Sequence, residues 1–176
     1  MFLGSTDAAC EVDRPALQRL ADQLPDIDVW FCSPMLRARQ TMDALQEQGC
    51  CPDGCTVEPG LREIDFGSWE GRTYAEIAAA EPERVQAWSD FDTFSFPGGE
   101  STRDFVARCD AVLQRFLQQD WNRQVAAVCH GGVIRMLICL ALGLPPSKYL
   151  FFQVDAPSLT VLDIYSNGGV LCGLNL

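Results

Sequence analysis

The sequence predicts a three-layer α/β/α fold, in which helices cover both faces of a mostly parallel sheet. Segments with helical spacing of apolar residues alternate with short apolar strands along most of the chain. Residues 124–129 form a continuous apolar run, which is typical of a strand covered on both faces. The chain has 176 residues and is 48% hydrophobic, so we expect one domain over residues 1–176 with a buried core.

The first part of the chain is expected to form a helix, a strand and a second helix. Residues 14–24 place apolar side chains on one helical face, and Pro25 ends this helix. A strand follows over residues 28–32. The second helix runs over residues 36–48, and Gly49 stands where a left-handed helix cap is expected.

The middle of the chain is predicted to be helical and to end in one long helix. Short helices over residues 74–80 and 83–88 are separated by Pro82. Ser101 is the expected N-cap of a long amphipathic helix that ends near Asp120.

The last part of the chain is expected to be rich in strands. The strand over residues 124–129 turns at His130 into a helix that reaches Leu142. Three further strands and one hairpin turn are expected: strands over residues 151–154, 159–165 and 170–174, and the turn Ser166-Asn167-Gly168-Gly169.

Charge and composition exclude some classes of function. The net charge is −11, which argues against a nucleic-acid surface, because such a surface needs clustered cations. Lys148 is the only lysine among the 13 basic residues, and the excess of arginine suits bidentate recognition of oxyanions. No segment reaches the roughly 18 apolar residues that a membrane helix needs, and the start of the chain does not have the pattern of a signal peptide. We therefore expect a protein without membrane association.

The nine cysteines indicate a reducing compartment, and hence a cytoplasmic location. An odd number cannot pair completely within the chain. Most of them lie in apolar runs typical of buried thiols: Cys32, Cys109, Cys129, Cys139 and Cys172. The segment Cys50-Cys51-Pro52-Asp53-Gly54-Cys55 fits either a zinc clip or an exposed turn. We favour the turn and expect no metal or cofactor, because zinc needs four ligands and no second cysteine pair or histidine is near.

His130 carries the sharpest functional signal. It follows a strand and precedes Gly131-Gly132 and a helix. A side chain at the carboxyl end of a strand points into the crevice where open α/β sheets bind ligands, and the helix start offers free N–H groups to an anion. The environment suits a phosphate, although a histidine in this position also fits a simple turn cap.

A second candidate cluster runs from Ser33 to Thr41, again at a strand end that opens a helix. A guanidinium beside a helix N-terminus can hold phosphate oxygens through parallel hydrogen bonds. Arg37 fits this role better than Arg39. The alternative is that Arg37 is an ordinary solvated arginine on a helix.

A third cluster, residues 61–71, places three acids between apolar residues. A carboxyl half-buried against apolar groups can have a raised pKa and donate a proton to a leaving oxygen. Glu63 is our candidate for this acid, whereas Asp65 and Glu70 fit solvated groups. The alternative is a surface turn anchored by Phe66 and Trp69.

These clusters, in this order, resemble the histidine phosphatase (phosphoglycerate mutase-like) superfamily over residues 4–162. Four motifs carry the resemblance: Cys32-Ser33-Pro34 with Arg37-Ala38 and Gln40-Thr41, Leu61-Arg62-Glu63 with Phe66-Gly67 and Glu70-Gly71, Pro97-Gly98-Gly99-Glu100-Ser101, and His130-Gly131-Gly132-Val133-Ile134-Arg135. The short length and the form of residues 61–71 are most similar to the α-ribazole phosphatase branch.

The resemblance implies roles for individual residues. Arg37 would bind the phosphoryl oxygens, His130 would stabilise their charge and Glu63 would protonate the leaving group. Ser33, Gly131 and Glu100 would help to bind a small phosphorylated substrate. The expected activity is hydrolysis of a phosphomonoester such as α-ribazole 5′-phosphate.

The chain departs from the family at its start. The family's nucleophile is a histidine in an Arg-His-Gly motif that ends the first strand, and no such motif occurs here. Residues 2–7 resemble the stretch just after that motif, so we expect the first strand and the nucleophile to be missing. The segment from Cys10 to Asp13, or a second copy of the chain in a homodimer, would then have to fill the gap in the sheet.

Three functional hypotheses follow. The first is a phosphomonoesterase whose first strand lies upstream of a wrongly assigned or truncated start. The second is a catalytically inactive relative that binds a phosphorylated metabolite or a partner protein. The third, a mutase, is disfavoured by the short length and by the missing nucleophile. All three require Arg37, Glu63 and His130 to share one cavity.

Overall fold

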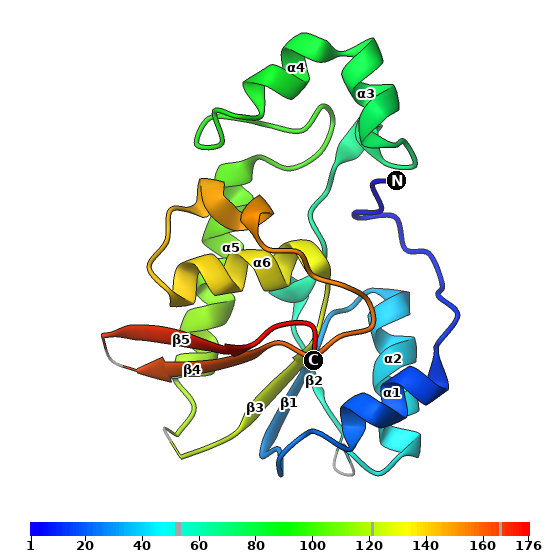
Figure 1. Ribbon diagram of the computed structural model, residues 1–176, viewed down its shortest axis with the longest axis vertical. Coiled ribbons are helices and arrows are strands. Elements are labelled where there is room, and N and C mark those ends of the chain that lie inside the picture. The colour runs from blue at the N-terminus through cyan, green and yellow to red at the C-terminus, as the bar shows by residue number, and fades with distance from the viewer. Residues whose placement is uncertain (52–53, 121, 166) are drawn as a thin grey trace.

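A computed structural model describes residues 1–51, 54–120, 122–165 and 167–176 (Figure 1). The strands are β1 (Val29–Cys32), β2 (Thr56–Val57), β3 (Val125–Val128), β4 (Val161–Tyr165) and β5 (Gly168–Gly173). The α-helices are α1 (Arg14–Ala21), α2 (Leu36–Glu47), α3 (Tyr74–Ala80), α4 (Pro82–Ala87), α5 (Thr102–Leu117) and α6 (Gly131–Ala141). Short 3-10 helices are η1 (Pro59–Leu61), η2 (Gly67–Trp69) and η3 (Pro146–Phe151).

The main sheet is parallel, has the order β2-β1-β3 and is packed on both faces. Successive side chains of β1 point to opposite faces, as the period of a strand requires. Trp30 and Cys32 enter a core with α1 and α2. Phe31 enters the larger core, where its ring lies 4.9 Å from that of Phe116 on α5. The predicted three-layer α/β/α fold with a parallel sheet is therefore confirmed.

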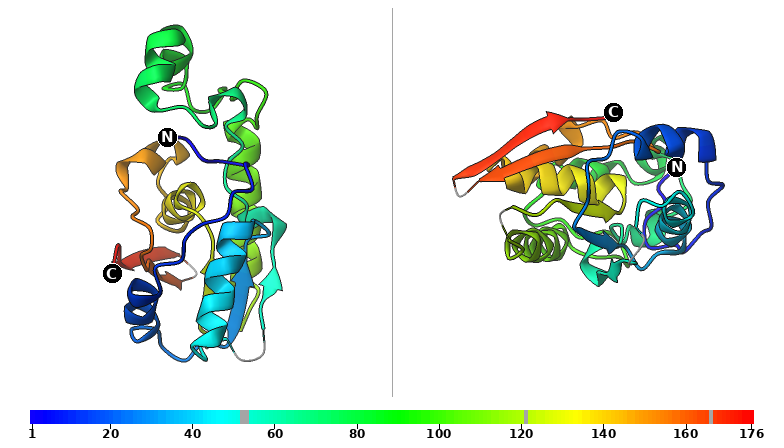
Figure 2. Two further views of the ribbon diagram at one scale, coloured as in Figure 1. Left: turned by 90° about the vertical axis from the view of Figure 1, so that its right-hand side faces the viewer. Right: turned by 90° about the horizontal axis from the view of Figure 1, so that it is seen from below.

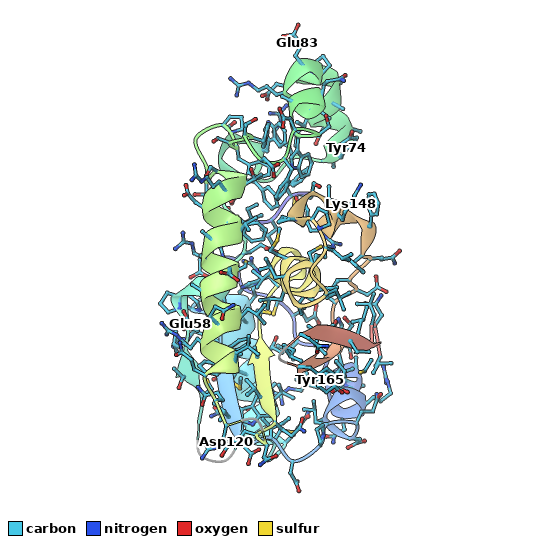
Figure 3. The ribbon with its side chains drawn as sticks, turned by 90° about the vertical axis from the view of Figure 1, so that its left-hand side faces the viewer. Glu58, Tyr74, Glu83, Asp120, Lys148 and Tyr165 are labelled. Carbon is cyan, nitrogen blue, oxygen red and sulfur yellow. The ribbon has the colours of Figure 1, made fainter. Side chains whose placement is uncertain are left out.

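The helix predictions hold apart from their ends. Asp13 caps α1 by accepting a hydrogen bond from the Ala16 N–H, and Ser101 caps α5 by accepting one from the Asp104 N–H. Gly49 has a φ of 83°, the expected left-handed conformation after α2. Figure 3 shows α5 running from the α3–α4 end, marked by Tyr74, to the opposite end at Asp120, so α5 links the two ends of the molecule.

The C-terminal strands form a separate antiparallel pair, β4 and β5. The predicted strand over residues 151–154 is wrong, because side chains rather than a neighbouring strand bind its carbonyl groups. Arg135 Nε donates to the Phe152 carbonyl, and Asn175 Nδ2 donates to the Gln153 carbonyl. In the predicted hairpin turn, Ser166 lies outside the described residues.

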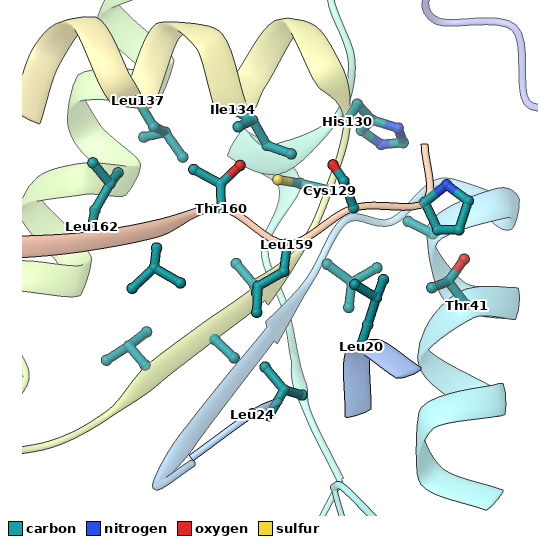
Figure 4. Close-up of a pocket in the computed structure, with 18 of the residues that line it drawn as sticks. Leu20, Leu24, Thr41, Cys129, His130, Ile134, Leu137, Leu159, Thr160 and Leu162 are labelled. Carbon is teal, nitrogen blue, oxygen red and sulfur yellow. The ribbon is translucent and has the colours of Figure 1, made fainter. Parts of the chain in front are cut away.

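The prediction that β3 is covered on both faces holds, although the cover is incomplete: Val125 and Ala127 pack against the larger core, and Ala126 and Val128 pack against the smaller one. All residues of β3 are only partly buried, because the strand also borders a cavity of about 1060 Å³ between it and the C-terminal segment. Figure 4 shows apolar side chains entering this space from several parts of the chain, including Leu20, Leu24, Ile134 and Leu159. The cavity thus lies between the main sheet and the β4–β5 pair.

Several cysteines depart from prediction, among them Cys129, which was expected to be buried and is only partly buried. Cys51 is 1% exposed and packs in the smaller core, so this part of the expected exposed turn is wrong, while Pro52 and Asp53 lie outside the described residues. Cys172 was expected to be buried but is exposed on β5. No group of three or more His, Cys, Asp or Glu side chains within the described ranges could hold a metal ion. No helix in those ranges is long and apolar enough to span a membrane.

The first thirteen residues form an extended segment without regular structure that passes α2 and reaches the α3 end of the molecule (Figures 1 and 2). The Phe2 N–H donates to the Arg72 carbonyl, and the Gly71 N–H donates back to the Phe2 carbonyl. The Phe2 ring lies 4.8 Å from that of Phe66. These contacts hold the start of the segment against residues 66–72.

Candidate active site

The candidate site lies where β1 and β3 end and α2 and α6 begin. Ser33 follows β1, and His130 follows β3 and occupies the N-cap position of α6. Because parallel strands end at the same edge of a sheet, both side chains reach one place. His130 Nε2 lies 2.7 Å from Ser33 Oγ, and both residues are buried.

The histidine side chain does not cap its helix. The backbone of His130 holds the N-cap conformation, but its side chain makes no capping hydrogen bond. The imidazole points into the cavity instead (Figure 4). The interpretation of His130 as a simple turn cap is therefore wrong.

His130 is neutral near pH 7. Burial, together with the positive charges of Arg37 and Arg108, lowers the pKa of His130 to about 3, and Asp7 acts in the opposite direction. A neutral imidazole beside two guanidinium groups can donate a hydrogen bond to a phosphoryl oxygen. A bound anion would offset the two positive charges and so raise the pKa of His130.

Glu63 lies just after η1, with only 8% of its surface exposed. Its carboxylate accepts hydrogen bonds from the Gly132 N–H and the Ile64 N–H, each at 3.0 Å. Burial raises the pKa of Glu63, whereas these two bonds and the charges of Arg108 and Arg37 act against that rise. The net shift is upward, which suits a group that donates a proton.

The close contact between the Glu63 carboxylate and the first turn of α6 requires a residue without a side chain at Gly132. A Cβ atom added at Gly132 would lie 2.4 Å from Glu63 Oε1, whereas one added at Gly131 would meet nothing within 4 Å. The close approach lets the first turn of α6 hold the carboxylate. Gly131 keeps its N–H at the positive end of the helix.

Arg37 lies in the first turn of α2, where its guanidinium binds the N-terminal segment. Nη1 donates to the Thr6 carbonyl at 2.9 Å, and Nη2 donates to the Gly4 carbonyl at 2.8 Å. Arg37 is therefore not a freely solvated helix arginine. Arg39, by contrast, is exposed.

Glu70 anchors the same N-terminal segment and is not the solvated group that the sequence predicted. Its carboxylate accepts hydrogen bonds from the N–H and hydroxyl groups of Ser5 and Thr6. Burial opposes ionisation, but the bonds from Thr6 and Ser5 together hold the pKa of Glu70 below its ordinary value. Asp65 is likewise engaged, by the Gly67 N–H at 2.9 Å. Glu70 thus helps to place the carbonyl groups that Arg37 binds.

Glu100, predicted to bind substrate, is held in an internal ion pair. Both carboxylate oxygens accept hydrogen bonds from Arg108, the shortest at 2.6 Å. A role in substrate binding would require Glu100 to leave this pair. Arg108 could not be identified from the sequence, because the polar face of an amphipathic helix gives no sign of which arginine faces inward.

Four of the predicted residues line one cavity. Its wall includes Arg37, Glu63, His130 and Gly131, whereas Ser33 reaches it only through its bond to His130. The arrangement offers a cation, a protonatable carboxyl, an imidazole and a helix N-terminus around one space. Such a set can bind a tetrahedral oxyanion and protonate a leaving oxygen.

Comparison with known proteins identifies relatives over most of the chain. The family model described as histidine phosphatase superfamily (branch 1) matches residues 11–176. Phosphoserine phosphatase 1 of Hydrogenobacter thermophilus is 29% identical over 85% of this chain and 71% of its own length. The adenosylcobalamin/alpha-ribazole phosphatase of Escherichia coli is 27% identical over 84% of this chain and 72% of its own length.

Another relative is much longer than this chain. The bifunctional protein Rv2228c of Mycobacterium tuberculosis is 32% identical over 77% of this chain, but the match spans only 37% of that protein. This chain therefore corresponds to about a third of that relative's length.

Solved structures share the fold. The alpha-ribazole phosphatase of Shigella flexneri superimposes with a TM-score of 0.82 at 24% identity, over 100% of this chain and 88% of that one. A mycobacterial glucosyl-3-phosphoglycerate phosphatase, solved with VO3, gives a TM-score of 0.81 at 28% identity, over 99% of this chain and 90% of that one.

Proposed function

Because this chain belongs to branch 1 of the histidine phosphatase superfamily, we propose that it hydrolyses small phosphomonoesters at the site formed by Arg37, Glu63 and His130. The observation that carries the proposal is that these three side chains line one cavity. They come from a helix start, a loop and a strand end. Their chemistry is complementary, so a phosphoryl group there meets a cation, a hydrogen-bond donor and an acid.

In the proposed reaction each group has a separate task. Arg37 keeps its bonds to the Thr6 and Gly4 carbonyls and binds phosphoryl oxygens through the three of its five N–H groups that those bonds leave over. His130 and the Gly131 N–H stabilise the charge on those oxygens in the transition state. A water molecule attacks phosphorus and forms the new P–O bond, while Glu63, whose pKa is raised, donates its proton to the leaving oxygen. The proton lost by the water restores the Glu63 carboxyl, and the products are an alcohol and inorganic phosphate.

The proposed substrate class is a small phosphoester, and α-ribazole 5′-phosphate is the first candidate. One relative is named for α-ribazole, another for phosphoserine and a structural neighbour for glucosyl-3-phosphoglycerate. These compounds share a phosphomonoester and differ in the group that carries it. A cytoplasmic role in cobalamin biosynthesis belongs to the same proposal.

A second function is supported by the histidine count. The covalent route expected from the resemblance uses one histidine to attack phosphorus and another to stabilise the phosphoryl oxygens. The 176 residues contain a single histidine, His130. Once His130 stabilises the oxygens, no imidazole in this sequence is left to attack. The chain would then bind a phosphorylated metabolite without turning it over.

Two measurements on the 176-residue chain test the proposal. Calorimetry with inorganic phosphate and with orthovanadate measures anion binding, and release of p-nitrophenol from p-nitrophenyl phosphate measures turnover. Arg37→Met should abolish anion binding. Arg39→Met is the matched control, because Arg39 lies on the same helix but is exposed. A panel of α-ribazole 5′-phosphate, phosphoserine and glucosyl-3-phosphoglycerate then ranks substrates.

The outcomes separate the two functions. Binding with turnover supports the hydrolase, and binding without turnover supports the second function. Equal binding by the wild type and Arg37→Met would contradict both, because it would place the anion elsewhere. Absence of any binding would also count against both.

A further inference from the structure

Arg108 lies on α5 and faces the loop that carries Glu63, with only 14% of its side chain exposed. Its Nη1 donates to the Gly60 carbonyl at 2.8 Å and to the Arg62 carbonyl at 2.7 Å. Its Nε and Nη2 donate to Glu100, and the guanidinium carbon lies 4.8 Å from the centre of the Phe105 ring. These contacts direct the group toward the protein's own backbone rather than toward a ligand.

We propose that Arg108 is a positioning residue, which fixes the backbone around Glu63 so that the carboxyl group meets the start of α6. The inference rests on the proposed function only for the role of Glu63 as the acid. The placement of the loop by Arg108 stands on the contacts alone.

The backbone around Glu63 needs to be held in place because it contains little regular structure. We call Arg108, with its bonds to the Gly60 and Arg62 carbonyls and to Glu100, the clamp. η1 ends at Leu61, and Glu63 follows without a strand or helix to set its direction. Arg62 directly precedes Glu63, so a bond to its carbonyl restricts the peptide unit that leads into the acid. One planar guanidinium holds two carbonyl groups at a fixed separation, which an ammonium group cannot reproduce while also binding a carboxylate in two places.

Glu100 completes the clamp from both its side chain and its backbone. Its carboxylate binds Arg108, and its side chain is 9% exposed, so the pair is shielded from water. The Glu100 N–H also donates to the Asp65 carbonyl at 3.0 Å. The backbone is therefore held before Glu63 by Arg108 and after it by Glu100.

The clamp also sets the charge around the acid. The charged groups that act on Glu63 are Arg108 and Arg37, and both lower its pKa against the rise caused by burial. Those that act on His130 are Arg37 and Arg108, which lower its pKa, and Asp7, which raises it. Removal of Arg108 should therefore raise the pKa of Glu63 and of His130 together.

The same helix supplies a matched control. Arg115, two turns after Arg108, forms an ion pair with Glu58, whose other oxygen accepts a hydrogen bond from the Gly60 N–H. This pair also touches the start of the loop, but Arg115 is 57% exposed and is not among the charges that act on Glu63 or His130. Arg115→Met tests a general loss of an arginine from α5.

The experiment uses NMR on the 176-residue chain, so it does not depend on turnover. Side-chain carboxyl signals of ¹³C-labelled glutamate follow Glu63, and the imidazole signals of the sole histidine follow His130. Amide exchange is measured over residues 61–65. The variants are Arg108→Met, Arg108→Lys, Glu100→Gln and Arg115→Met.

We expect Arg108→Met to raise both pKa values and to speed amide exchange in the loop about tenfold or more. Arg108→Lys keeps the positive charge but loses the planar guanidinium. The pKa values of Glu63 and His130 should therefore stay near those of the wild type, while amide exchange in the loop should still be fast. Glu100→Gln should speed exchange in the same residues. Arg115→Met should change neither readout. If Arg108→Met is unfolded, Arg108→Lys and Glu100→Gln still report the exchange.

The proposal is overturned if exchange over residues 61–65 is unchanged in Arg108→Lys and Glu100→Gln, or if Arg115→Met speeds it equally. A different result would show that only the proposed phosphatase function is wrong. In that case the wild type would turn over no phosphoester, while the exchange and titration differences between variants would remain.

Discussion

His130 Nε2 lies 2.7 Å from Ser33 Oγ, so a hydrogen bond joins the ends of β1 and β3 inside the site. The Ser33 hydroxyl also accepts a hydrogen bond from the Met35 N–H at the entry to α2. The serine thereby links His130 to the entry of α2, the helix that carries Arg37. The orientation of the imidazole depends on this link, which gives the first prediction.

Replacement of Ser33 by alanine should destabilise the protein by about 1–3 kcal/mol, because it leaves a buried imidazole nitrogen without its partner. The free energy of unfolding from urea titration measures this, and the imidazole NMR signals of the sole histidine report the changed environment. Ser89→Ala is the control, since Ser89 is exposed. A loss in Ser33→Ala no larger than in Ser89→Ala would show that the bond contributes little.

Phosphate binding should raise the pKa of His130 from about 3. Burial, Arg37 and Arg108 hold it low, and a bound dianion offsets the two positive charges and favours the imidazolium form. The measurement is an NMR titration of the imidazole with and without inorganic phosphate, with sodium chloride at equal ionic strength as the control. An unchanged midpoint under saturating phosphate would place the anion away from His130.

Gly132→Ala should misplace the acid while leaving the fold intact. The new Cβ would lie 2.4 Å from Glu63 Oε1, and the carboxyl, as the end of a flexible side chain, would swing away and lose the Gly132 N–H. Phosphatase activity should fall about 100-fold, as a shift of about 1 Å in a reacting group can cause.

Gly131→Ala provides the matched control for this prediction, because its Cβ would meet nothing within 4 Å. Activity is measured with p-nitrophenyl phosphate, or the pKa of Glu63 is measured by NMR if the chain does not turn over. Equal effects of the two substitutions would show that Gly132 is not needed to hold Glu63.

Glu70→Ala should release the N-terminal segment. The amides of Ser5 and Thr6 both donate to this carboxylate, so they should exchange faster in the variant. The pKa of Glu70 is lowered, so its contribution to stability is present above its ordinary pKa and is lost as the pH falls through the folded-state value. Hydrogen exchange measured by NMR checks this.

Glu81→Ala controls for the loss of a carboxylate elsewhere, because Glu81 binds Arg72 and Trp69 rather than the N-terminal segment. If the amides of Ser5 and Thr6 exchange equally fast in both variants, Glu70 does not anchor the segment.

Local signals in the sequence were enough for the α-helices and for the parallel strands β1 and β3, whereas the two-residue strand β2 was not predicted. Caps at Asp13 and Ser101, the glycine at residue 49 and the apolar run of β3 depend on neighbours along the chain. The convergence of Arg37 and His130 also follows from local sequence, since each begins a helix after a parallel strand.

Features that depend on distant partners could not be predicted. The carbonyl groups of residues 152 and 153 are bound by Arg135 and Asn175, and no local pattern shows that this prevents a strand. The apolar run of β3 does not reveal the cavity beside it, so the incomplete burial of β3 could not be predicted. Glu100 belongs to a motif, but its partner Arg108 is found only when the helix is packed against the loop.

The stability of the protein in acid should depend on His130. Its pKa is about 3 in the folded state and 6.5 in an ordinary environment. Between these values the unfolded chain binds a proton at this residue and the folded protein does not, so stability falls as the pH is lowered from 6.5 towards 3. The limiting slope for one such proton is about 1.4 kcal/mol per pH unit.

Glu63 acts in the opposite sense, because its raised pKa favours the folded state when the carboxyl is protonated. The contribution of His130 is therefore isolated by comparing the wild type with His130→Asn from pH 7 to pH 4, using urea unfolding at each pH. The variant should lose less stability on acidification than the wild type. Since the chain contains no other histidine, parallel curves for the two proteins would mean that the imidazole of His130 is not protected from protonation in the folded state.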